Sequence, residues 1–475
     1  MNIGISISCH STKDTPPERY HIIERCLDSL LEIKKKYNIY INIVNDTITE
    51  THKKILDKYD FPIINNPFNM GIAYTKNIGI KSILEQGLDY GILIDDDVII
   101  KKHELVEKYY NGMKNTYYNH FSYFIEREDE KITKHTIDNE NVIHTPYVNG
   151  CILTFTRKLI EECGYFEILP YKWGHEHSKF SLRALQKGFI PAWADVDLED
   201  AVDEHIREFK DGVSRISTYR IQSTFAKLLY DYNCKIMGSD IKRVIKFHPL
   251  KNNIVKYYIN LERSGDRRDS LESNFPDAIR IEACDGLKLQ EYKDVIPPKK
   301  TVSTPTELGC TLSHLRAIRC AYLNNLDEVM VIEDDLLNPY EDKWDKTLRE
   351  MIDNRPENSN CVIFNSNNPL VYEESDEYIP WKQGYWGTAC YWLNRTAMKI
   401  ICDRYVNQDF IIDMNNFESS LYHQADMGIL YESIDAYNYT KPLFKFLDGK
   451  NLIREVHHIQ DSLINKLCDD IFKIG

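Results

Sequence analysis

Residues 90–97 read YGILIDDD, a short apolar run that ends directly in three aspartates. The run at 90–94 is typical of a buried strand that ends at a polar turn. The flanking sequence alternates in the same way, with predicted strands at 3–8 and 39–44 and predicted helices at 19–36 and 72–86. This β-α-β-α-β order predicts a mostly parallel sheet covered by helices. Ligands of such sheets bind beyond the carboxyl ends of the strands, which is where the aspartates are expected.

The pattern starts again in the second half of the chain. Residues 328–332 (EVMVI) are a predicted strand that ends in Glu333, Asp334 and Asp335. Ahead of it the sequence predicts a strand at 254–261 and helices at 264–274 and 307–325. The segment 235–252 has mixed charge and contains Pro249, so we place a linker there. We therefore expect two α/β domains in tandem, at 1–245 and 250–475.

The composition is globular and acidic. The chain has 475 residues, 43% of them hydrophobic and 28% charged, with a formal net charge of −14. A net negative charge argues against a nucleic-acid partner. The N-terminus lacks a signal-peptide pattern, and no apolar run is long enough to span a membrane, so a soluble, cytoplasmic protein is expected. The twelve cysteines contain no C-x-x-C pair, which argues against structural zinc and favours reduced thiols.

The aspartates after the first-half strand are candidate metal ligands. Alternate residues of an extended chain point the same way, so Asp95 and Asp97 are expected to face one site. Carboxylate oxygens at this spacing suit Mn²⁺ or Mg²⁺ carrying a diphosphate, although a solvated turn explains three adjacent acids equally well. Asp46 ends the preceding strand, where it is placed to accept hydrogen bonds from a nucleobase or ribose. Candidate donor contacts at the start of the next helix are Asn69, Gly71 and Asn77.

A family resemblance covers roughly residues 1–210. The segments ISISCHST, RCLDSL, NIVNDT, NPFNMGIAYTKNIGI, LIDDDVII and VNGCILTFTRKLIEECGYFE occur in this order. Together they resemble family 2 glycosyltransferases, which have the GT-A fold. The resemblance implies that Asp46 contacts a uracil-type base and that Asp95 and Asp97 contact ribose, metal and phosphate.

The same resemblance extends to KWGHEHSKFSLRALQKGF at 172–189. Relatives carry G-x-E-D at the start of this helix, and that motif supplies the catalytic base. Gly174 and Glu176 are retained here, whereas His177 replaces the acidic partner. The resemblance implies Glu176 as the base, His177 as a contact to metal or acceptor, and His205 as a late metal ligand. The alternatives are helix capping for the first two and an ordinary surface or core histidine for His205.

The second half resembles a different family. Arg263, Arg267 and Arg268 follow its first strand, and guanidinium groups suit phosphate, although solvated side chains are commoner. Its segments YYINLERSGDRR, ACDG, ELGCTLSH, VIEDD, GTACYWLNRTAMKI, QADMGIL and KPLFKF look like family 25 glycosyltransferases, which include lipooligosaccharide and procollagen galactosyltransferases. The resemblance implies donor contacts at Asn260, Arg263, Arg267, Asp285, Gly286, Ser313, His314 and Asp334. It also implies a metal pair, Glu333 and Asp335, and a base, Asp426. A core histidine at His314 and a helix N-cap at Asp426 stay open as alternatives.

These features together predict a metal-dependent, inverting hexosyltransferase with two GT-A domains. The expected donor is UDP-galactose or UDP-glucose, and the expected acceptor is a protein, such as hydroxylysine of a collagen-like chain, or a growing glycan. Bifunctionality and a homodimer are left open. A nucleotidyltransferase is the alternative enzyme class, but ISISCHSTKD lacks the Gly-rich basic loop usual for that class. A non-catalytic scaffold in one half, more readily the first, is the other alternative.

Overall fold

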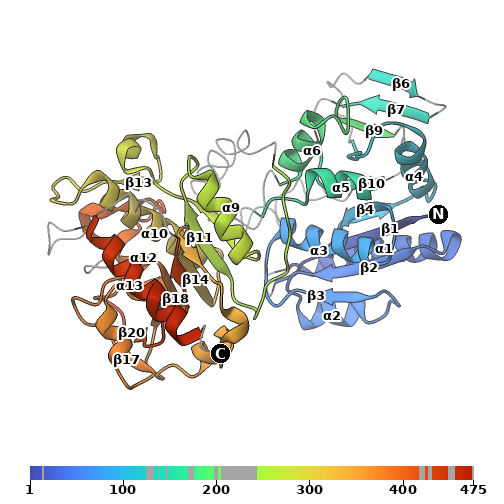
Figure 1. Ribbon diagram of the computed structural model, residues 1–475. Helices are drawn as coiled ribbons and strands as arrows, with labels where there is room; N and C mark the ends of the chain where they lie inside the picture. The colour runs from blue at the N-terminus through green and yellow to red at the C-terminus, as the bar shows by residue number, and fades with distance from the viewer. Residues whose placement is uncertain are drawn as a thin grey trace. The chain divides into compact units, whose positions relative to one another are not determined.

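The computed structural model describes residues 1–12, 15–124, 133–137, 140–145, 148–168, 176–196, 202–204, 243–416, 423–425, 430–447 and 455–472. The chain divides into two compact units, Met1–Phe247 (unit 1) and His248–Gly475 (unit 2). Figure 1 draws unit 1 from blue to green and unit 2 from yellow-green to red. Among the described residues, no helix combines the length and apolar character needed to cross a bilayer.

Unit 1 is built around a five-stranded sheet with the order β3-β2-β1-β4-β8 (Figure 1). Its strands are β1 (Ile3–Cys9), β2 (Tyr40–Asn45), β3 (Ile63–Asn65), β4 (Tyr90–Asp95), β5 (Val98–Ile100), β6 (Thr133–Ile137), β7 (Glu140–His144), β8 (Ile152–Thr156), β9 (Ala194–Val196) and β10 (Val202–Glu204). Its described helices are α1 (Pro17–Tyr37), α2 (Glu50–Leu56), α3 (Ile72–Glu85), α4 (Leu105–Asn115), α5 (Arg157–Cys163) and α6 (Glu176–Gln186). The first four strands of the sheet are parallel and β8 is antiparallel to β4, so the carboxyl ends of β1, β2 and β4 meet at one edge.

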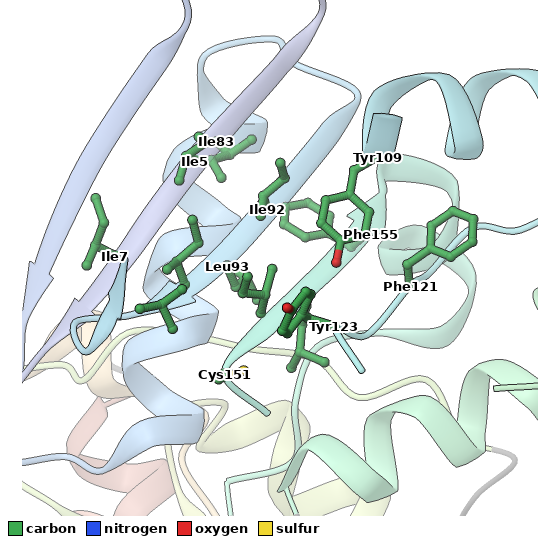
Figure 2. Packing of buried hydrophobic residues seen from close by; sticks show 14 of the residues in the cluster. Ile5, Ile7, Ile83, Ile92, Leu93, Tyr109, Phe121, Tyr123, Cys151 and Phe155 are labelled. Carbon is green, nitrogen blue, oxygen red and sulfur yellow. The ribbon is translucent and has the colours of Figure 1, made fainter. Parts of the chain in front are cut away.

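The core of unit 1 holds this sheet edge in place. Figure 2 shows Ile5 from β1, Ile92 and Leu93 from β4 and Phe155 from β8 in one apolar cluster. A Cβ atom at Gly91 would lie 2.2 Å from the Phe155 ring, so only glycine lets β4 pass the ring on its antiparallel neighbour. The packing fixes β4, whose last residue is the first aspartate of the triplet.

Unit 2 has a seven-stranded sheet with the order β12-β11-β14-β18-β16-β20-β17. Its strands are β11 (Lys256–Asn260), β12 (Ile279–Glu282), β13 (Val295–Ile296), β14 (Glu328–Glu333), β15 (Leu336–Leu337), β16 (Cys361–Asn365), β17 (Tyr378–Pro380), β18 (Cys390–Asn394), β19 (Ile412–Asp413), β20 (Ala436–Tyr439) and β21 (Lys445–Phe446). Its α-helices in the described ranges are α9 (Gly265–Asn274), α10 (Pro305–Leu323), α11 (Leu348–Asp353), α12 (Arg395–Tyr405) and α13 (Glu455–Phe472). Helix α10 begins with a capping box between Thr304 and Glu307 and packs on β11, β12 and β14.

Both sheets have the same central order. In unit 1 the strands run β2-β1-β4-β8, and in unit 2 they run β12-β11-β14-β18, with the last strand antiparallel in each. The strand that ends in acids is therefore flanked in both units by the first strand of the unit and by the antiparallel strand. The predicted α/β class with two Rossmann-like sheets is confirmed.

Candidate active sites

The middle acid of the unit 1 triplet is anchored by the protein itself. Asp96 is buried, its Oδ2 accepts a hydrogen bond from the His10 backbone N–H at 3.1 Å, and its Oδ1 accepts one from Arg19. The second nitrogen of Arg19 lies 3.1 Å from the Asp97 carboxylate. Sequence reasoning missed Arg19, which is the third residue of α1 and lies far from the triplet along the chain. Asp97 therefore has a protein cation beside it before any metal ion binds.

The first acid of this triplet is differently placed. Asp95 Oδ1 lies 3.2 Å from the Nζ atom of Lys76, which is an ion-pair distance, yet this buried oxygen makes no hydrogen bond. Burial raises the pKa of Asp95 to about 6, although Lys76 opposes the rise. The ammonium group of Lys76 also donates to the Gly150 carbonyl at 2.7 Å. Lys76 is almost fully buried on α3 and is a second site residue that the sequence did not reveal.

Glu176 and His177 are close to the same lysine. Glu176 begins α6, is buried, and its Oε1 lies 3.2 Å from His177 Nδ1. Burial raises the pKa of Glu176, but the hydrogen bond and charge of His177, with Lys76, outweigh it and lower the pKa to about 2. A Cβ atom at Gly150 would lie 3.0 Å from His177 Nδ1, so this ring lies against the backbone that Lys76 binds. Asp95, Lys76, Glu176 and His177 thus form one polar cluster.

The residues predicted to contact the donor near the start of α3 mostly form hydrogen bonds within the protein. Both carboxylate oxygens of Asp46 accept backbone N–H groups, from Met70 at 2.6 Å and Gly71 at 2.8 Å. Gly71 has a φ of 85° and precedes the first helical residue, a conformation that favours glycine. The Asn69 side chain accepts from the Gly71 N–H at 3.2 Å. Asp46, Asn69 and Gly71 therefore shape the turn into α3, and a direct contact to a nucleotide stays a prediction.

Asn77 has a packing role instead. Its side chain is fully buried, donates to the Phe166 carbonyl at 2.8 Å and accepts from the Phe166 N–H at 2.9 Å. These two bonds fix the segment after α5 to the middle of α3. The structure gives Asn77 no access to a ligand, so its assignment as a donor contact is withdrawn.

The acid triplet of unit 2 repeats the arrangement. The middle acid, Asp334, accepts from the Asn260 side chain at 2.7 Å and from Arg267 at 2.9 Å. Asn260 is the last residue of β11, and Arg267 is the third residue of α9. Arg267 also lies 3.7 Å from Asp335. As in unit 1, an arginine from the helix after the first strand contacts the second and third acids.

The outer acids of unit 2 differ in their surroundings. Glu333 accepts from Thr388 Oγ1 at 2.6 Å and lies 3.2 Å from His314 Nε2. Burial raises the pKa of Glu333, but its hydrogen bond to His314 outweighs this and lowers it. Asp335 is buried, its Oδ1 has no hydrogen-bond partner, and burial together with the charge of Glu333 raises its pKa.

Four further residues predicted as donor contacts in unit 2 are Arg263, Asp285, Gly286 and Ser313, the last of which lies on α10. Arg263 forms an ion pair with Asp285 and is the more exposed partner. A Cβ atom at Gly286 would lie 1.7 Å from the Pro305 carbonyl oxygen, so this glycine is explained by close packing on α10. Ser313 is buried, accepts from the Cys284 N–H at 2.8 Å and donates to the Gly309 carbonyl at 2.6 Å. Gly286 and Ser313 have structural roles here, and their contact with a donor stays a prediction.

Two predicted residues and one motif position lie outside the described residues. These are His205, Asp426 and Gly174. His314 is described and is almost fully buried, but it is more than a core histidine because it joins Tyr391 to Glu333. Its position directly beside the triplet keeps a functional role open.

Each unit offers a carboxylate site that fits a divalent cation. Asp95 in unit 1 and Asp335 in unit 2 each have a buried oxygen without a hydrogen-bond partner. Buried carboxylate oxygens normally have a hydrogen-bond or ionic partner, and a divalent cation would supply one at each of these positions. Oxygen ligands from paired carboxylates are the donor set that Mg²⁺ and Mn²⁺ prefer. The candidate pairs are Asp95 with Asp97 and Glu333 with Asp335.

Comparisons with known proteins agree with this geometry. Residues 18–166 match the family model for glycosyl transferase family 2, and residues 253–415 match that for glycosyltransferase family 25 (LPS biosynthesis protein). The uncharacterized glycosyltransferase R363 of Acanthamoeba polyphaga mimivirus is 35% identical over 202 residues, which are 42% of this chain and 78% of that relative.

Two solved structures share parts of the architecture at low similarity. The mannosyltransferase PcManGT from Pyrobaculum calidifontis, in complex with GDP-Man and Mn²⁺, is 12% identical with a TM-score of 0.36, over 49% of this chain and 64% of that one. TarS residues 1–349 from S. aureus, in complex with UDP, are 15% identical with a TM-score of 0.30, over 42% of this chain and 58% of that one. The chain thus spans less than two thirds of each of these structures. The family matches and the viral relative show that this chain belongs to the glycosyltransferases, with a family 2 segment followed by a family 25 segment.

Proposed function

We propose that the chain is a metal-dependent, inverting transferase that moves galactose or glucose from a UDP-sugar to a hydroxyl group. One arrangement in both units supports this function: a strand of the central sheet ends in three acids, and the middle acid is anchored by the end of the first strand and by an arginine of the helix after it. One outer acid of each triplet, Asp95 in unit 1 and Asp335 in unit 2, keeps a buried carboxylate oxygen without a hydrogen bond, at the sheet edge where nucleotides bind α/β proteins.

The cation would be Mn²⁺ or Mg²⁺, held by Asp95 with Asp97 in unit 1 and by Glu333 with Asp335 in unit 2. A divalent cation at this position neutralises the negative charge that develops on a departing diphosphate. Arg19 and Arg267 lie beside the outer acids, so they add positive charge where the diphosphate would bind. With a net charge of −14, the chain as a whole repels an anionic donor, and local cations at the site offset this repulsion.

The acceptor hydroxyl must lose a proton as the new bond forms, which requires a carboxylate base. Glu176 is the candidate in unit 1, since the positive charge of Lys76 acts both on Glu176 and on Asp95 of the triplet. Asp426 is the candidate in unit 2 from family resemblance. A single base and direct displacement fit the inverting outcome implied by both resembled families.

The acceptor is proposed from the family 25 segment. Hydroxylysine of a collagen-like protein and a hydroxyl of a growing glycan are the two candidates. Two complete sites would make the chain bifunctional. A scaffold role for unit 1 is the second candidate function, and one observation favours it: a carboxylate whose pKa is lowered to about 2 is a weak proton acceptor.

A donor screen with the full chain tests the proposal. UDP-galactose, UDP-glucose and GDP-mannose are each incubated with Mn²⁺ and a hydroxylysine-containing collagen-like peptide, and nucleotide release and peptide mass are measured. We expect UDP release and a mass increase of one hexose with a UDP-hexose only. We also expect EDTA to abolish transfer and added Mn²⁺ to restore it. Full transfer in chelated buffer would contradict the metal requirement. No UDP release from any donor, together with pyrophosphate release from a parallel incubation with UTP and hexose 1-phosphate, would indicate a nucleotidyltransferase.

A further inference from the structure

A second kind of ligand set lies beside the unit 2 triplet. Cys310 and His314 are one turn apart on α10, and Glu333 ends β14. One ligand atom from each of the three lies within 4.8 Å of the other two. Residues four apart on a helix face the same side, so α10 presents the thiol and the imidazole together. His314 is buried, whereas Cys310 and Glu333 are partly exposed, so an ion could enter from solvent.

The spacing fits a shared ion. A tetrahedral zinc ion with bonds of about 2.0–2.3 Å keeps its ligand atoms roughly 3.3–3.8 Å apart. His314 Nε2 and Glu333 Oε1 are already 3.2 Å apart. The Cys310 ligand atom lies within 4.8 Å of both, and small side-chain rotations would shorten these distances to those of a zinc site. Little rearrangement of the backbone is therefore required.

The surrounding hydrogen bonds orient the ligands. The Tyr391 hydroxyl lies 3.0 Å from His314 Nδ1, which leaves Nε2 directed at Glu333. The Thr388 hydroxyl donates to Glu333 Oε1 at 2.6 Å and fixes the carboxylate. Metal-binding histidines usually have such a partner on the ring nitrogen that does not bind the metal.

A comparable cluster in unit 1 lacks these features. Cys9, His52 and Asp96 also lie within 4.8 Å of one another, but all three are buried. Both oxygens of Asp96 are occupied, one by the His10 N–H and the other by Arg19. A cation there would have to displace a guanidinium group from a buried carboxylate, which makes this cluster the natural negative control.

We propose that Cys310 Sγ, His314 Nε2 and a Glu333 carboxylate oxygen bind one thiophilic divalent cation, of which Zn²⁺ is the representative. Thiolate and imidazole ligands select Zn²⁺ over Mn²⁺, so this site differs in chemistry from the oxygen pair Glu333–Asp335. Three protein ligands leave a fourth position for water or an anionic oxygen. The C-x₃-H spacing at 310–314 is not a C-x-x-C pair, which is why a search for paired cysteines passes over it. The inference goes beyond sugar transfer and does not depend on it.

Cobalt binding to the full chain tests this site, because Co²⁺ substitutes for Zn²⁺ and its thiolate complexes absorb in the near ultraviolet. The reduced protein is titrated with Co²⁺ without nucleotide sugar, so the result is independent of catalysis. We expect a thiolate-to-cobalt charge-transfer band in the unaltered chain, its loss in Cys310→Ser and Cys310→Ala, and its bleaching by Zn²⁺. Cys320→Ser, a buried cysteine on the same helix, and Cys9→Ser, in the unit 1 cluster, should both retain the band.

A conservative change tests the orientation of His314. Tyr391→Phe removes the hydroxyl beside Nδ1 and should weaken cobalt binding by about 10- to 100-fold. Circular dichroism confirms that each variant is folded. Absence of the band from the unaltered chain would overturn the site, and so would a band that Cys9→Ser removes and Cys310→Ser leaves. An unchanged affinity in Tyr391→Phe would count against coordination through Nε2.

Discussion

Asp294 is held between two arginines of α10. Its carboxylate accepts from Arg316 at 2.7 and 3.1 Å and from Arg319 at 2.7 Å, and both arginine side chains are buried. Burial raises the pKa of Asp294, but the two guanidinium groups outweigh this and hold the pKa well below its usual range. Asp294 directly precedes β13 in the chain, so its ion pairs tie that strand to α10. They therefore stabilise the helix that carries Cys310 and His314.

The first prediction concerns the stability of unit 2. Because the folded pKa of Asp294 is depressed, its contribution is fully present above the unfolded pKa of about 4 and is lost as the pH falls below that value. Asp294→Asn leaves two buried guanidinium groups without a carboxylate and should cost about 3 kcal/mol at neutral pH. Denaturant unfolding of the full chain at neutral and acidic pH measures both effects.

The matched control is Asp345→Asn, which removes the acid of an exposed pair with Lys441. We expect no comparable loss, because exposed pairs contribute little. Equal destabilisation by the two substitutions would show that the buried network has no special weight.

The second prediction concerns Glu176. Glu176→Gln retains the size and hydrogen-bonding capacity of the side chain but cannot accept a proton, so UDP binding should persist while any transfer by unit 1 is lost. The substitution is made in an Asp335→Ala chain, where unit 1 is the remaining candidate for catalysis, and UDP release is followed. If release in that chain survives Glu176→Gln, the base lies elsewhere, and His177 is the next candidate.

At the scale of elements, the same anchoring of the acid triplet occurs in both units. The third residue of the helix after the first strand is an arginine, Arg19 on α1 and Arg267 on α9, and it contacts the second and third acids of the triplet. The end of the first strand supplies the other anchor, through the His10 N–H in unit 1 and the Asn260 side chain in unit 2. The middle acid is thereby tied to two elements, and the sheet edge is fixed where the outer acids project.

The third prediction follows from the anchoring of Asp96 by Arg19. Arg19→Met leaves Asp96 buried without its cation and should destabilise unit 1 by about 3 kcal/mol at neutral pH. Burial already raises the pKa of Asp96, and removal of Arg19 raises it further, so protonation should reduce the loss at acidic pH. Hydrogen exchange of the β1 and β4 peptides in the full chain reports the local stability. Lys35→Met, which breaks an exposed pair on the same helix, should leave these peptides unchanged. A loss that is equal at neutral and acidic pH would contradict the role of Asp96.

The elements could be predicted well from the sequence, and the contacts between them could not. Apolar periodicity predicts α1, α3 and α10 to within two residues at each end. The strand-then-acids pattern correctly locates β4 and β14. The pairing of Arg19 with Asp96 joins residues 77 positions apart, and no local pattern encodes it. Asn77 and Ser313 show the ambiguity of such patterns, because a polar residue near a site motif can equally satisfy buried backbone groups.

The whole molecule carries two separate sheets with one central strand order. Each unit therefore has its own carboxyl-end edge, its own anchored acid and its own candidate cation pair, although the two halves show no obvious sequence repeat. Unit 2 retains the motifs of its resembled family more fully, whereas unit 1 substitutes His177 for an acid. We therefore expect unit 2 to perform the hexosyl transfer and unit 1 to perform a second transfer or none.

Asp335 is the residue on which this assignment depends. It is buried with an oxygen that makes no hydrogen bond, so its removal costs the fold little, and Asp335→Asn provides a variant of equal size. Loss of one carboxylate from a metal pair that carries a diphosphate should remove several kcal/mol of transition-state stabilisation, on the order of a hundredfold or more in rate. Circular dichroism of the full chain verifies that Asp335→Ala, Asp335→Asn and Asp97→Ala are folded.

The most direct test of the account is UDP release and product mass for the Asp335 and Asp97 variants of the full chain, measured with UDP-hexose and Mn²⁺. We predict that Asp335→Ala and Asp335→Asn eliminate the hexosyl transfer while Asp97→Ala leaves it intact. Loss of all transfer in Asp97→Ala, with no effect of either Asp335 substitution, would contradict the account and assign catalysis to unit 1.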